Sequence, residues 1–265
     1  MDGKMRFCAR FVSFQRHHTL FVTQFRTKKQ TKSDMSWLLK FFTSSLGQKL
    51  IMSLTGLFLI LFLVIHLIGN VQLLYNDQGE AFNLYTYFMT HNPLIKTVSY
   101  GLYLFIIIHT IQGIGLAIRN RAARGNQKYA VQVTRATNTN AFMAKSMAWL
   151  GMLILIFLII HLGDFWYKMK FGELGMVTYE GHEEPVKDLY AQVATSFKVP
   201  WIVLAYVIGQ IALAMHLRHG FQSAFQTLGI NHPKYSPLIR GLGIAYAVLI
   251  PLGFAIIPII FFLTK

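Results

Sequence analysis

Four histidines stand inside long apolar runs of this sequence, and their surroundings divide them into two pairs. His66 and His161 each occupy an Ile-His-Leu triplet, ten residues after a glycine. His109 and His216 each open a His-x-x-x-Gly pattern. Hydrocarbon offers no water to the ring nitrogens of an imidazole, so such a residue is costly unless a partner binds it. Paired buried imidazoles therefore predict coordination of a metal or of a metal-containing group.

The apolar runs that carry these histidines are close to the roughly 20 residues that a membrane-spanning helix needs. The expected spans cover about residues 50–74, 97–118, 143–165, 199–220 and 238–263. Each of the first four contains one of the histidines, while the fifth contains Pro251 and Pro258, which should kink it. Only 13% of the residues are charged, against roughly a quarter in soluble domains. We therefore expect an all-α integral membrane protein with a five-helix bundle.

The cysteine count and the net charge exclude several classes of function. Cys8 is the single cysteine, so this chain alone cannot supply an iron–sulfur cluster, a disulfide framework or a thioether-linked haem. The formal net charge of +15 could suggest nucleic acid, but the basic residues cluster in the loops between the expected spans. Basic residues in such loops set the orientation of a membrane protein. We expect no nucleic-acid partner.

Charged residues divide unevenly between alternate loops. The segments after the second and fourth spans contain the acid-free basic set Arg119, Arg121, Arg124, Lys128, Arg135, Lys145, Lys234 and Arg240. The segments after the first and third spans contain the acids Asp77, Glu80, Asp164, Glu173, Glu180, Glu183, Glu184 and Asp188. The positive-inside rule then predicts that the amino terminus lies inside and the carboxyl terminus outside.

This orientation gives the two histidine pairs different depths. His66 lies fifteen residues after Ile51, about 22 Å of helical rise, which places it in the outer half of the membrane. His161 has the matching position in the third helix, which runs in the same direction. The second and fourth helices run the opposite way, so His109 and His216 belong to the inner half. The sequence predicts two sites stacked across the membrane.

Each pair of histidines suits a haem better than a bare cation. Two imidazoles are a poor complete site for zinc, which takes four ligands, but they are the axial set of a six-coordinate haem iron. We therefore expect two b-type haems, with the outer iron on His66 and His161 and the inner iron on His109 and His216. With both axial positions filled, neither iron binds dioxygen, and the expected task is electron transfer across the bilayer.

The glycines of the second pattern support a flat group beside the inner pair. Gly113 and Gly220 each follow their histidine by four residues, so they lie on the same helix face, where a side chain would block a porphyrin. His219 is one turn from His216 and directly precedes Gly220. Spacing within the fourth helix alone therefore leaves two candidate ligands.

Residues 1–34 differ in composition from the rest of the chain. They contain eight Lys and Arg against two Asp, and no apolar run long enough to span a bilayer. A leader of this kind can be a transit peptide, a disordered basic arm, or translated sequence upstream of a true start at Met35. We favour the last interpretation, with residues 35–265 as the five-helix domain.

The order of several short motifs resembles that of a known family. They are Ser53-Leu-Thr-Gly56 before Ile65-His66-Leu67, Glu80-Ala-Phe-Asn83 with Phe88-Met89, His109 with Gly113, Ile160-His161-Leu162, and His216 with Gly220 and Gly229. Residues 35–265 resemble the cytochrome b membrane-anchor subunit of two-haem succinate:quinone oxidoreductases, the succinate dehydrogenases and fumarate reductases of bacteria. The family's ligand stands thirteen residues before the second glycine, which selects His216 over His219.

The resemblance implies a subunit of a respiratory, tricarboxylic-acid-cycle complex in the bacterial cytoplasmic (inner) membrane. A flavoprotein subunit with covalent FAD would carry out the succinate or fumarate chemistry, so this chain would have no catalytic residue of its own. An iron–sulfur subunit would exchange electrons with the inner haem, and the outer haem would exchange them with a membrane quinone. Ser53 is expected to contact the cofactor, and Arg119 and Arg218 are the nearest candidates for the haem propionates.

The resemblance also shows where this chain departs from part of the family. One two-haem branch has functional acids in the first outer loop and just before the fourth ligand, where this chain has Phe88 and Ala214. These replacements argue against the proton route of that branch. The polar residues near the expected outer haem that could touch a quinone are Asn70, Gln72, His91 and Asp164.

Three alternatives remain open on the sequence. A cytochrome b anchor of a hydrogenase or formate dehydrogenase also presents bis-histidine haems, but the spacing to Gly229 and the fifth helix argue against it. A transporter with a proton relay would usually add intramembrane carboxylates, and the expected helices contain none away from their ends. The third alternative is a purely structural membrane subunit.

Overall fold

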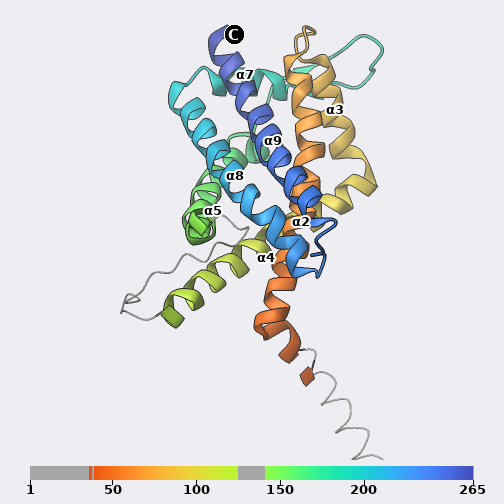
Figure 1. Cartoon of the computed structure of the whole chain (residues 1–265). Coiled ribbons are helices and arrows are strands. Elements are labelled where there is room, and N and C mark those ends of the chain that lie inside the picture. The colour runs from red at the N-terminus through yellow and green to blue at the C-terminus, as the bar shows by residue number, and fades with distance from the viewer. Residues whose placement is uncertain (1–35, 38, 125–140, 265) are drawn as a thin grey trace, which may run out of the picture. The chain divides into compact units, whose positions relative to one another are not determined.

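The protein is mostly helical, and a computed structural model describes residues 36–37, 39–124 and 141–264 (Figure 1). Five helices of this described part are long and apolar enough to cross a membrane: Ser45–Leu74, Pro93–Ala123, Ser146–Phe171, Pro200–Thr227 and Ser236–Thr264. The prediction of a multi-pass helical protein is confirmed. The expected leader 1–34, Met35, and the loop residues Lys128 and Arg135 lie outside the described residues, as does the side chain of Lys145.

The chain divides into two compact units, residues 1–49 and residues 50–265. In the described part of the first unit, Ser44 separates a short helical stretch, residues 39–43, from the next helix. The Ser44 hydroxyl donates to the carbonyl oxygen of Phe41 and accepts from the backbone N–H of Gly47, as an N-cap does. The second unit contains the four membrane-buried histidines.

The spans are built from helices that alternate with short connecting segments. Their bounds are α2 (Ser45–Val71) with η1 (Gln72–Leu74), α4 (Pro93–Arg124), α5 (Ala141–His161) with η2 (Leu162–Tyr167) and α6 (Lys168–Phe171), α8 (Pro200–Thr227) and α9 (Ser236–Thr264). Most begin or end beyond the apolar runs, because helices continue into the polar layers of a membrane. At α4, for example, the side chain of Asn92 accepts from the N–H groups of Leu94 and Ile95, and Pro93 opens the helix.

The third span changes its winding directly after His161. Residues Leu162–Tyr167 form a π-helix, η2, before the short helix α6. The sequence predicted an uninterrupted helix over residues 143–165. A π-helical turn adds a residue to the turn and so rotates the side chains that follow, and such turns are frequent at functional sites.

The segments between the spans gather at one end of the second unit, which we call the loop face. They are α3 (Glu80–His91), the antiparallel strands β1 (Met176–Val177) and β2 (Val186–Lys187), and α7 (Leu189–Phe197), near the carboxyl-terminal end of α9 (Figure 1). Seven of the eight acids of residues 50–265 lie in these connecting segments, and the eighth, Asp164, lies in η2 toward the same end of its span. The sequence analysis expected none of these elements, and the hairpin makes the fold helical rather than purely all-α.

The side chain of Asn83 joins three segments of the loop face. Its amide nitrogen donates to the hydroxyl of Tyr179 at 2.8 Å and to the carboxylate of Asp188 at 3.0 Å. Its amide oxygen accepts from the backbone N–H of Tyr190 at 3.0 Å. Burial raises the pKa of Tyr179, so this phenol stays neutral as a partner. Asn83, 1% exposed, thereby ties α3 to the loop of the hairpin and to the start of α7.

The turn before α3 requires a glycine. Gly79 has a φ of 90°, in the left-handed region that side chains disfavour. A Cβ at this position would also collide with the ring of Tyr190. The side chain of Asp77 accepts from the N–H groups of Gly79 and Ala81, which fixes the first turn of α3. The geometry brings α3 close against the start of α7.

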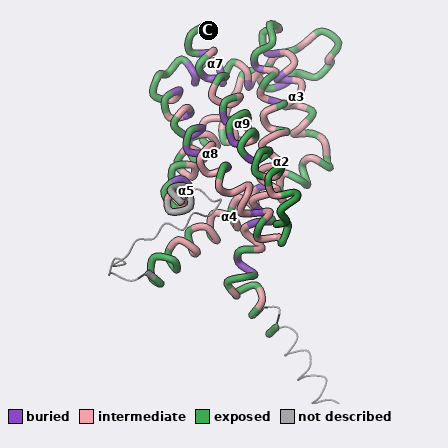
Figure 2. The backbone as a smooth tube through the Cα atoms, viewed as in Figure 1, coloured by how far each residue is buried: buried purple, intermediate pink, exposed green. Residues whose placement is uncertain are grey.

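The apolar core of the second unit lies at the loop face. It consists of Leu73, Phe82, Leu189, Val193, Phe197, Val203, Tyr206, Ile257 and Phe261. These residues come from η1, α3, α7, α8 and α9, so burial of one cluster fixes five elements. Figure 2 shows that buried segments gather near α7 and α3, whereas intermediate and exposed residues predominate along α4.

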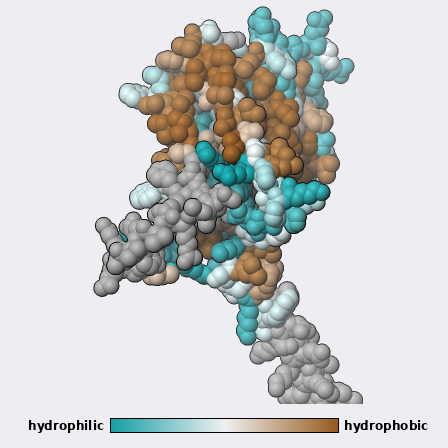
Figure 3. Space-filling model, in the orientation of Figure 1, coloured by the Kyte–Doolittle hydropathy of each residue, from teal (hydrophilic) through white to brown (hydrophobic). Residues whose placement is uncertain are grey.

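Helices α8 and α9 form the most closely packed pair of spans. Gly229, with φ 79°, terminates α8, and the N–H of Ile230 donates back to the carbonyl of Phe225. Helix α9 continues through Pro251 and Pro258, both buried. The hydroxyl of Tyr246 on α9 donates to a backbone carbonyl of α2. Apolar side chains predominate on the visible surface over the upper parts of α8 and α9, near the loop face, as expected for helices that face lipid (Figure 3).

The Asn83 network gives the first testable prediction. Asn83→Ala should remove the hydrogen bonds of a buried side chain, including the acceptor for the N–H of Tyr190. The free energy of unfolding should fall by about 2–3 kcal/mol. The measurement is the midpoint of thermal unfolding of the detergent-purified protein, which should fall by several degrees. Thr195→Ala is the control, because the exposed Thr195 hydroxyl bonds only to a carbonyl of its own helix. Equal midpoints for the two variants would contradict the role of Asn83.

Candidate functional site

The histidines that the sequence pairs as outer ligands lie in contact, edge to face. His66 of α2 and His161, the last residue of α5, have ring centroids 5.8 Å apart with an interplanar angle of 85°. Aromatic rings surround this outer pair: Phe62 and Phe254 contact His66, and Phe157, Phe165 and Tyr206 contact His161. The outer pair therefore lies in an apolar, water-poor environment.

The other two histidines also lie together. His109 of α4 and His216 of α8 have ring centroids 6.3 Å apart with an interplanar angle of 67°. In the described part of the chain, no further aromatic ring contacts this inner pair. His219 makes no ring contact with His109 there and is half-buried one turn away. The geometry thus brings His109 to His216, the histidine selected by the spacing to Gly229.

The hydroxyl of Thr55 orients His109. Thr55 is 4% exposed, and its hydroxyl lies 2.8 Å from the carbonyl oxygen of Ile51 and 3.2 Å from Nδ1 of His109. A Thr55 hydroxyl that directs its one proton at Ile51 accepts from Nδ1–H of the imidazole. The Nε2 nitrogen is then unprotonated, which is the form that binds a metal.

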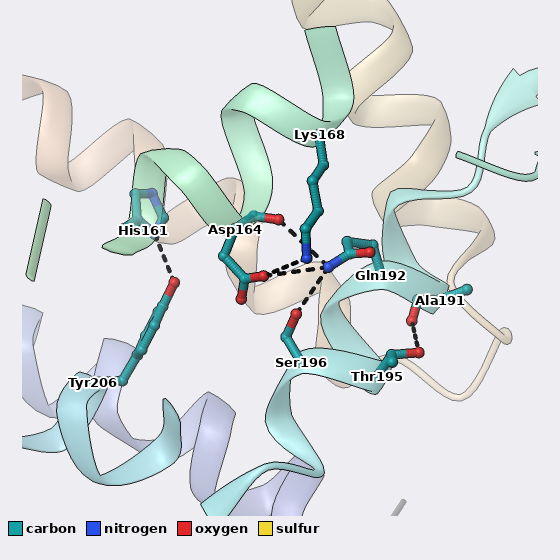
Figure 4. A network of polar contacts seen from close by, with 8 residues as sticks. All are labelled: His161, Asp164, Lys168, Ala191, Gln192, Thr195, Ser196 and Tyr206. Atoms are coloured by element: carbon teal, nitrogen blue, oxygen red, sulfur yellow. Dashed lines mark hydrogen bonds and ion pairs between the residues drawn. The ribbon is translucent and has the colours of Figure 1, made fainter. Parts of the chain in front are cut away.

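The outer histidines also have polar neighbours at Nδ1. The hydroxyl of Tyr206 lies 3.2 Å from Nδ1 of His161, as Figure 4 shows. The amide of Asn70 donates to the carbonyl oxygen of His66 at 2.7 Å and lies 3.4 Å from its Nδ1. The second distance is too long for a strong hydrogen bond, so Asn70 mainly fixes the helical turn at His66. In both rings Nε2 has no hydrogen bond within the described residues.

His216 has an unsatisfied nitrogen. Its Nδ1 is buried and finds no hydrogen-bond partner among the residues that the structure describes. An unpaired polar atom in hydrocarbon costs several kcal/mol by order of magnitude. A partner bound at this nitrogen would form the missing bond and remove that cost.

The spacing within each pair suits ligands on opposite sides of one metal. A metal–imidazole bond of about 2 Å on each side, with about 1 Å from each nitrogen to its ring centre, separates two trans rings by about 6 Å. The measured separations are 5.8 and 6.3 Å. Within the described residues, no group of three or more His, Cys, Asp or Glu could hold a metal ion. A bare cation would therefore have only two protein ligands at either pair.

The two glycines of the inner pattern leave room beside their histidines. A Cβ added at Gly220 would meet no heavy atom within 4 Å, and one at Gly113 would meet only the terminal methyl of Met52 at 3.7 Å. Gly56 lies against the His109 ring, where an added Cβ would be 3.4 Å from the imidazole. Larger residues at these positions would take up space that a flat ligand needs.

The remaining predicted contacts are less close to the histidine rings. Ser53 is buried on α2, two residues before Thr55, and it is Thr55 that reaches His109. Arg119 and Arg218 are exposed near the ends of α4 and α8, beyond their histidines. Along its helix, each arginine lies on the side of the histidine that is away from the loop face.

A polar network follows the outer pair. Asp164 of η2 accepts from the Lys168 ammonium at 2.7 Å, and Gln192 of α7 approaches its carboxylate at 3.4 Å and donates to Ser196 at 2.9 Å (Figure 4). The second carboxylate oxygen of Asp164 is buried and has no hydrogen-bond partner in the described part of the chain. Asp164 thus presents an uncommitted acceptor one turn beyond His161.

The other polar residues predicted near the outer site divide by position. Gln72 lies in η1, just beyond Asn70. His91 stacks on Tyr87 at the far end of α3, with 4.0 Å between ring centroids, and forms no contact with the outer pair among the described residues. Of the predicted set, Asn70 and Asp164 are therefore the best placed beside the outer histidines.

Three residues near the pairs were missed by the sequence analysis: Thr55, Tyr206 and Gln210. Thr55 and Tyr206 supply the polar neighbours of His109 and His161. Gln210 is 5% exposed, lies on α8 between Tyr206 and His216, and has a buried amide oxygen with no partner in the described part. A hydroxyl or amide inside an apolar run was the available signal, but it does not say which neighbouring helix receives it.

Comparison of the chain with protein-family models, with curated proteins and with solved structures found no match.

Proposed function

We propose that this chain is the membrane-anchor dihaem cytochrome b subunit of a succinate:quinone oxidoreductase. The observation that supports the proposal best is the geometry of the two histidine pairs. Each joins two membrane helices with the ring separation of trans ligands, and the described residues offer no third donor that would suit another metal. The order of the motifs along the chain supports the choice of family.

In this proposal His66 and His161 hold one haem b, and His109 and His216 hold the other. A bound haem supplies one-electron transfer. The chain's own residues orient the ligands and exclude water: Thr55 fixes the tautomer of His109, while aromatic rings shield the outer pair. Dry surroundings and hydrogen bonds to the axial ligands are among the means by which a protein sets a haem potential.

Two sites at different depths are what electron transfer between a soluble partner and a membrane carrier requires. The inner pair would exchange electrons with an iron–sulfur subunit, which a flavoprotein subunit supplies. The outer pair would exchange them with quinone. Quinone chemistry also needs proton exchange, and Asp164 has a free carboxylate oxygen one turn from His161, with Lys168 holding the other. We assign Asp164 the role of a proton-exchanging group beside the quinone.

The face opposite the loop face would receive the soluble subunits. The exposed residues Arg119 and Arg121 lie in the last turns of α4, which ends at Arg124, and Arg218 and Arg240 lie on α8 and α9 toward the same side. No acid of residues 50–265 belongs to this face. A surface of one charge sign accelerates encounter and fixes the orientation of a complementary partner.

Single histidine replacements test the proposal. His66→Leu and His161→Leu should remove the same component of the reduced-minus-oxidised visible spectrum, because either change breaks the outer site. His109→Leu and His216→Leu should remove the other component. Each variant should retain about half of the haem of the unmodified protein, since one of two sites survives.

His219→Leu is the matched control for this series, because His219 lies on the same helix and makes no ring contact with His109. It should retain both spectral components. Loss of a component in His219→Leu with retention in His216→Leu would contradict the inner pair. Four variants with unchanged spectra would contradict haem ligation altogether.

The hydrogen bond from His109 to Thr55 gives a separate prediction. Thr55→Val keeps the side-chain volume but removes the hydrogen-bond acceptor. Loss of a hydrogen bond to a metal-binding histidine weakens metal binding by about 10–100-fold. The inner haem should therefore transfer faster to an added haem-scavenging apoprotein. Thr227→Val is the control, because the Thr227 hydroxyl bonds only to a carbonyl of its own helix. Equal transfer rates would exclude a role of Thr55 in ligand orientation.

Charge reversal tests the docking face. The triple replacement of Arg119, Arg121 and Arg124 by Glu should weaken co-purification of the soluble subunits and leave the haem content unchanged, since these residues lie beyond the ligands. Lys170, Lys187 and Lys198 on the loop face provide a control triple replacement. If the arginine variant keeps its partners in high salt, the basic residues act only in membrane orientation.

A further inference from the structure

A second candidate binding site lies on the loop face, away from the histidine pairs. It is a cavity of about 500 Å³ lined by residues of α3, the first turn of α4, α6 and the hairpin. We call it the loop-face pocket. Its volume falls within the range of pockets that hold small molecules or headgroups, roughly 300–1,000 Å³.

Positive charge dominates the walls of the pocket. Lys96, Lys170 and Lys187 contribute three ammonium groups, and Glu184 contributes the one carboxylate. Lys187 donates to the carbonyl oxygen of Met169 at 2.6 Å. The side-chain ammonium groups of Lys96 and Lys170 form no hydrogen bond or ion pair within the described residues. Two cations from different spans thus face one cavity without an anion between them.

The single carboxylate of the pocket is already engaged. The hydroxyl of Tyr87 donates to Glu184, and this bond raises the pKa of the Tyr87 phenol. His91 stacks on the same ring, and its Nδ1 lies 2.8 Å from the backbone oxygen of Tyr87. Glu184 is thereby held to the α3 side of the pocket and does not neutralise the lysines of the other segments.

Apolar side chains also line the pocket. Val186 and Leu189 are 2% and 8% exposed, Met176 is 57% exposed, and Met169 belongs to the same lining. The pocket therefore combines cations with apolar lining residues. That combination fits an amphiphile with an anionic head better than a freely soluble anion.

The pocket lies where membrane spans end. Lys96 is three residues into α4, and Lys170 is one residue from the end of the third span. Aromatic residues lie one to two helical turns further along the same spans, where Trp166 donates to the hydroxyl of Tyr103 at 2.8 Å and contacts Phe171. Trp and Tyr concentrate at the headgroup layer of membranes. A basic pocket at this depth is placed to meet lipid phosphate.

We propose that the loop-face pocket binds a phosphate group, supplied by the headgroup of an anionic membrane phospholipid, between Lys96 and Lys170. The site is independent of the histidine pairs and of the proposed electron transfer. A bound headgroup would bridge α4 and α6, and so hold the first turn of α4 against the segment that follows the outer histidine pair.

The test is binding of short-chain phosphatidylglycerol to the full-length protein purified in non-ionic detergent, measured by isothermal titration calorimetry. The double variant Lys96→Gln/Lys170→Gln should bind about 30-fold more weakly, because each basic residue near a lipid surface contributes roughly a tenfold or smaller factor. Lys198→Gln is the matched control. Lys198 is exposed at the start of a span on the same face and lies outside the pocket.

Two further ligands identify the source of the phosphate. Phosphatidylcholine of equal chain length, which has no net charge, should bind more weakly than phosphatidylglycerol. Inorganic phosphate should bind much more weakly than either lipid, because it lacks the apolar part. Phosphate that binds as tightly as phosphatidylglycerol, with the same loss in the double variant, would overturn the lipid source.

A charge-retaining variant distinguishes loss of the positive charges from misfolding. Lys96→Arg/Lys170→Arg keeps both cations and should bind phosphatidylglycerol within a few-fold of the unmodified protein. Equal affinities for the Gln pair and the unmodified protein would overturn the site. So would an equal loss in Lys198→Gln, since the effect would then be a property of the whole face.

Discussion

Imidazole nitrogens inside a bilayer must find partners within the protein, and this requirement governs how the spans are arranged. Two pairs of helices bring their histidines to within 5.8 and 6.3 Å between ring centroids. Polar side chains that are themselves costly in hydrocarbon, Thr55 and Tyr206, lie beside two of the rings. The buried Nδ1 of His216 lacks such a neighbour in the described part of the chain. A metal held between the rings of each pair would bind the other ring nitrogen, Nε2.

The contacts of the loop face have a different role, because they fix the ends of the spans. The apolar core and the Asn83 network lie there, and the spans below pack more loosely. Helix α4 shows this most clearly, because Leu102 is the one buried residue among its positions 93–123. The inner pair joins this helix to α8, so a group held between His109 and His216 would connect a weakly packed helix to the tightly packed part of the unit.

Hydrophobic runs and charge segregation predicted the spans and the histidine partners, because length and helical direction determine which residues share a depth. They could not predict η2, since the hydrophobic pattern of an apolar run does not distinguish a π-helical turn from an α-helical one. Periodicity also gave no sign of α3, α7 or the hairpin, which Asn83 and Gly79 hold through contacts far apart in sequence. The second glycine of the fourth-helix motif, Gly229, has a structural role, since its positive φ ends α8.

Haem content of the purified unmodified chain tests the central claim most directly. A pyridine haemochrome assay should give two b-type haems per chain, and electron paramagnetic resonance of the oxidised protein should show two low-spin ferric centres, because each iron has two imidazole ligands. One haem per chain, or a dominant high-spin signal at full occupancy, would contradict two bis-histidine sites. A chain that binds no haem when haem is supplied during expression would contradict the electron-transfer account as a whole.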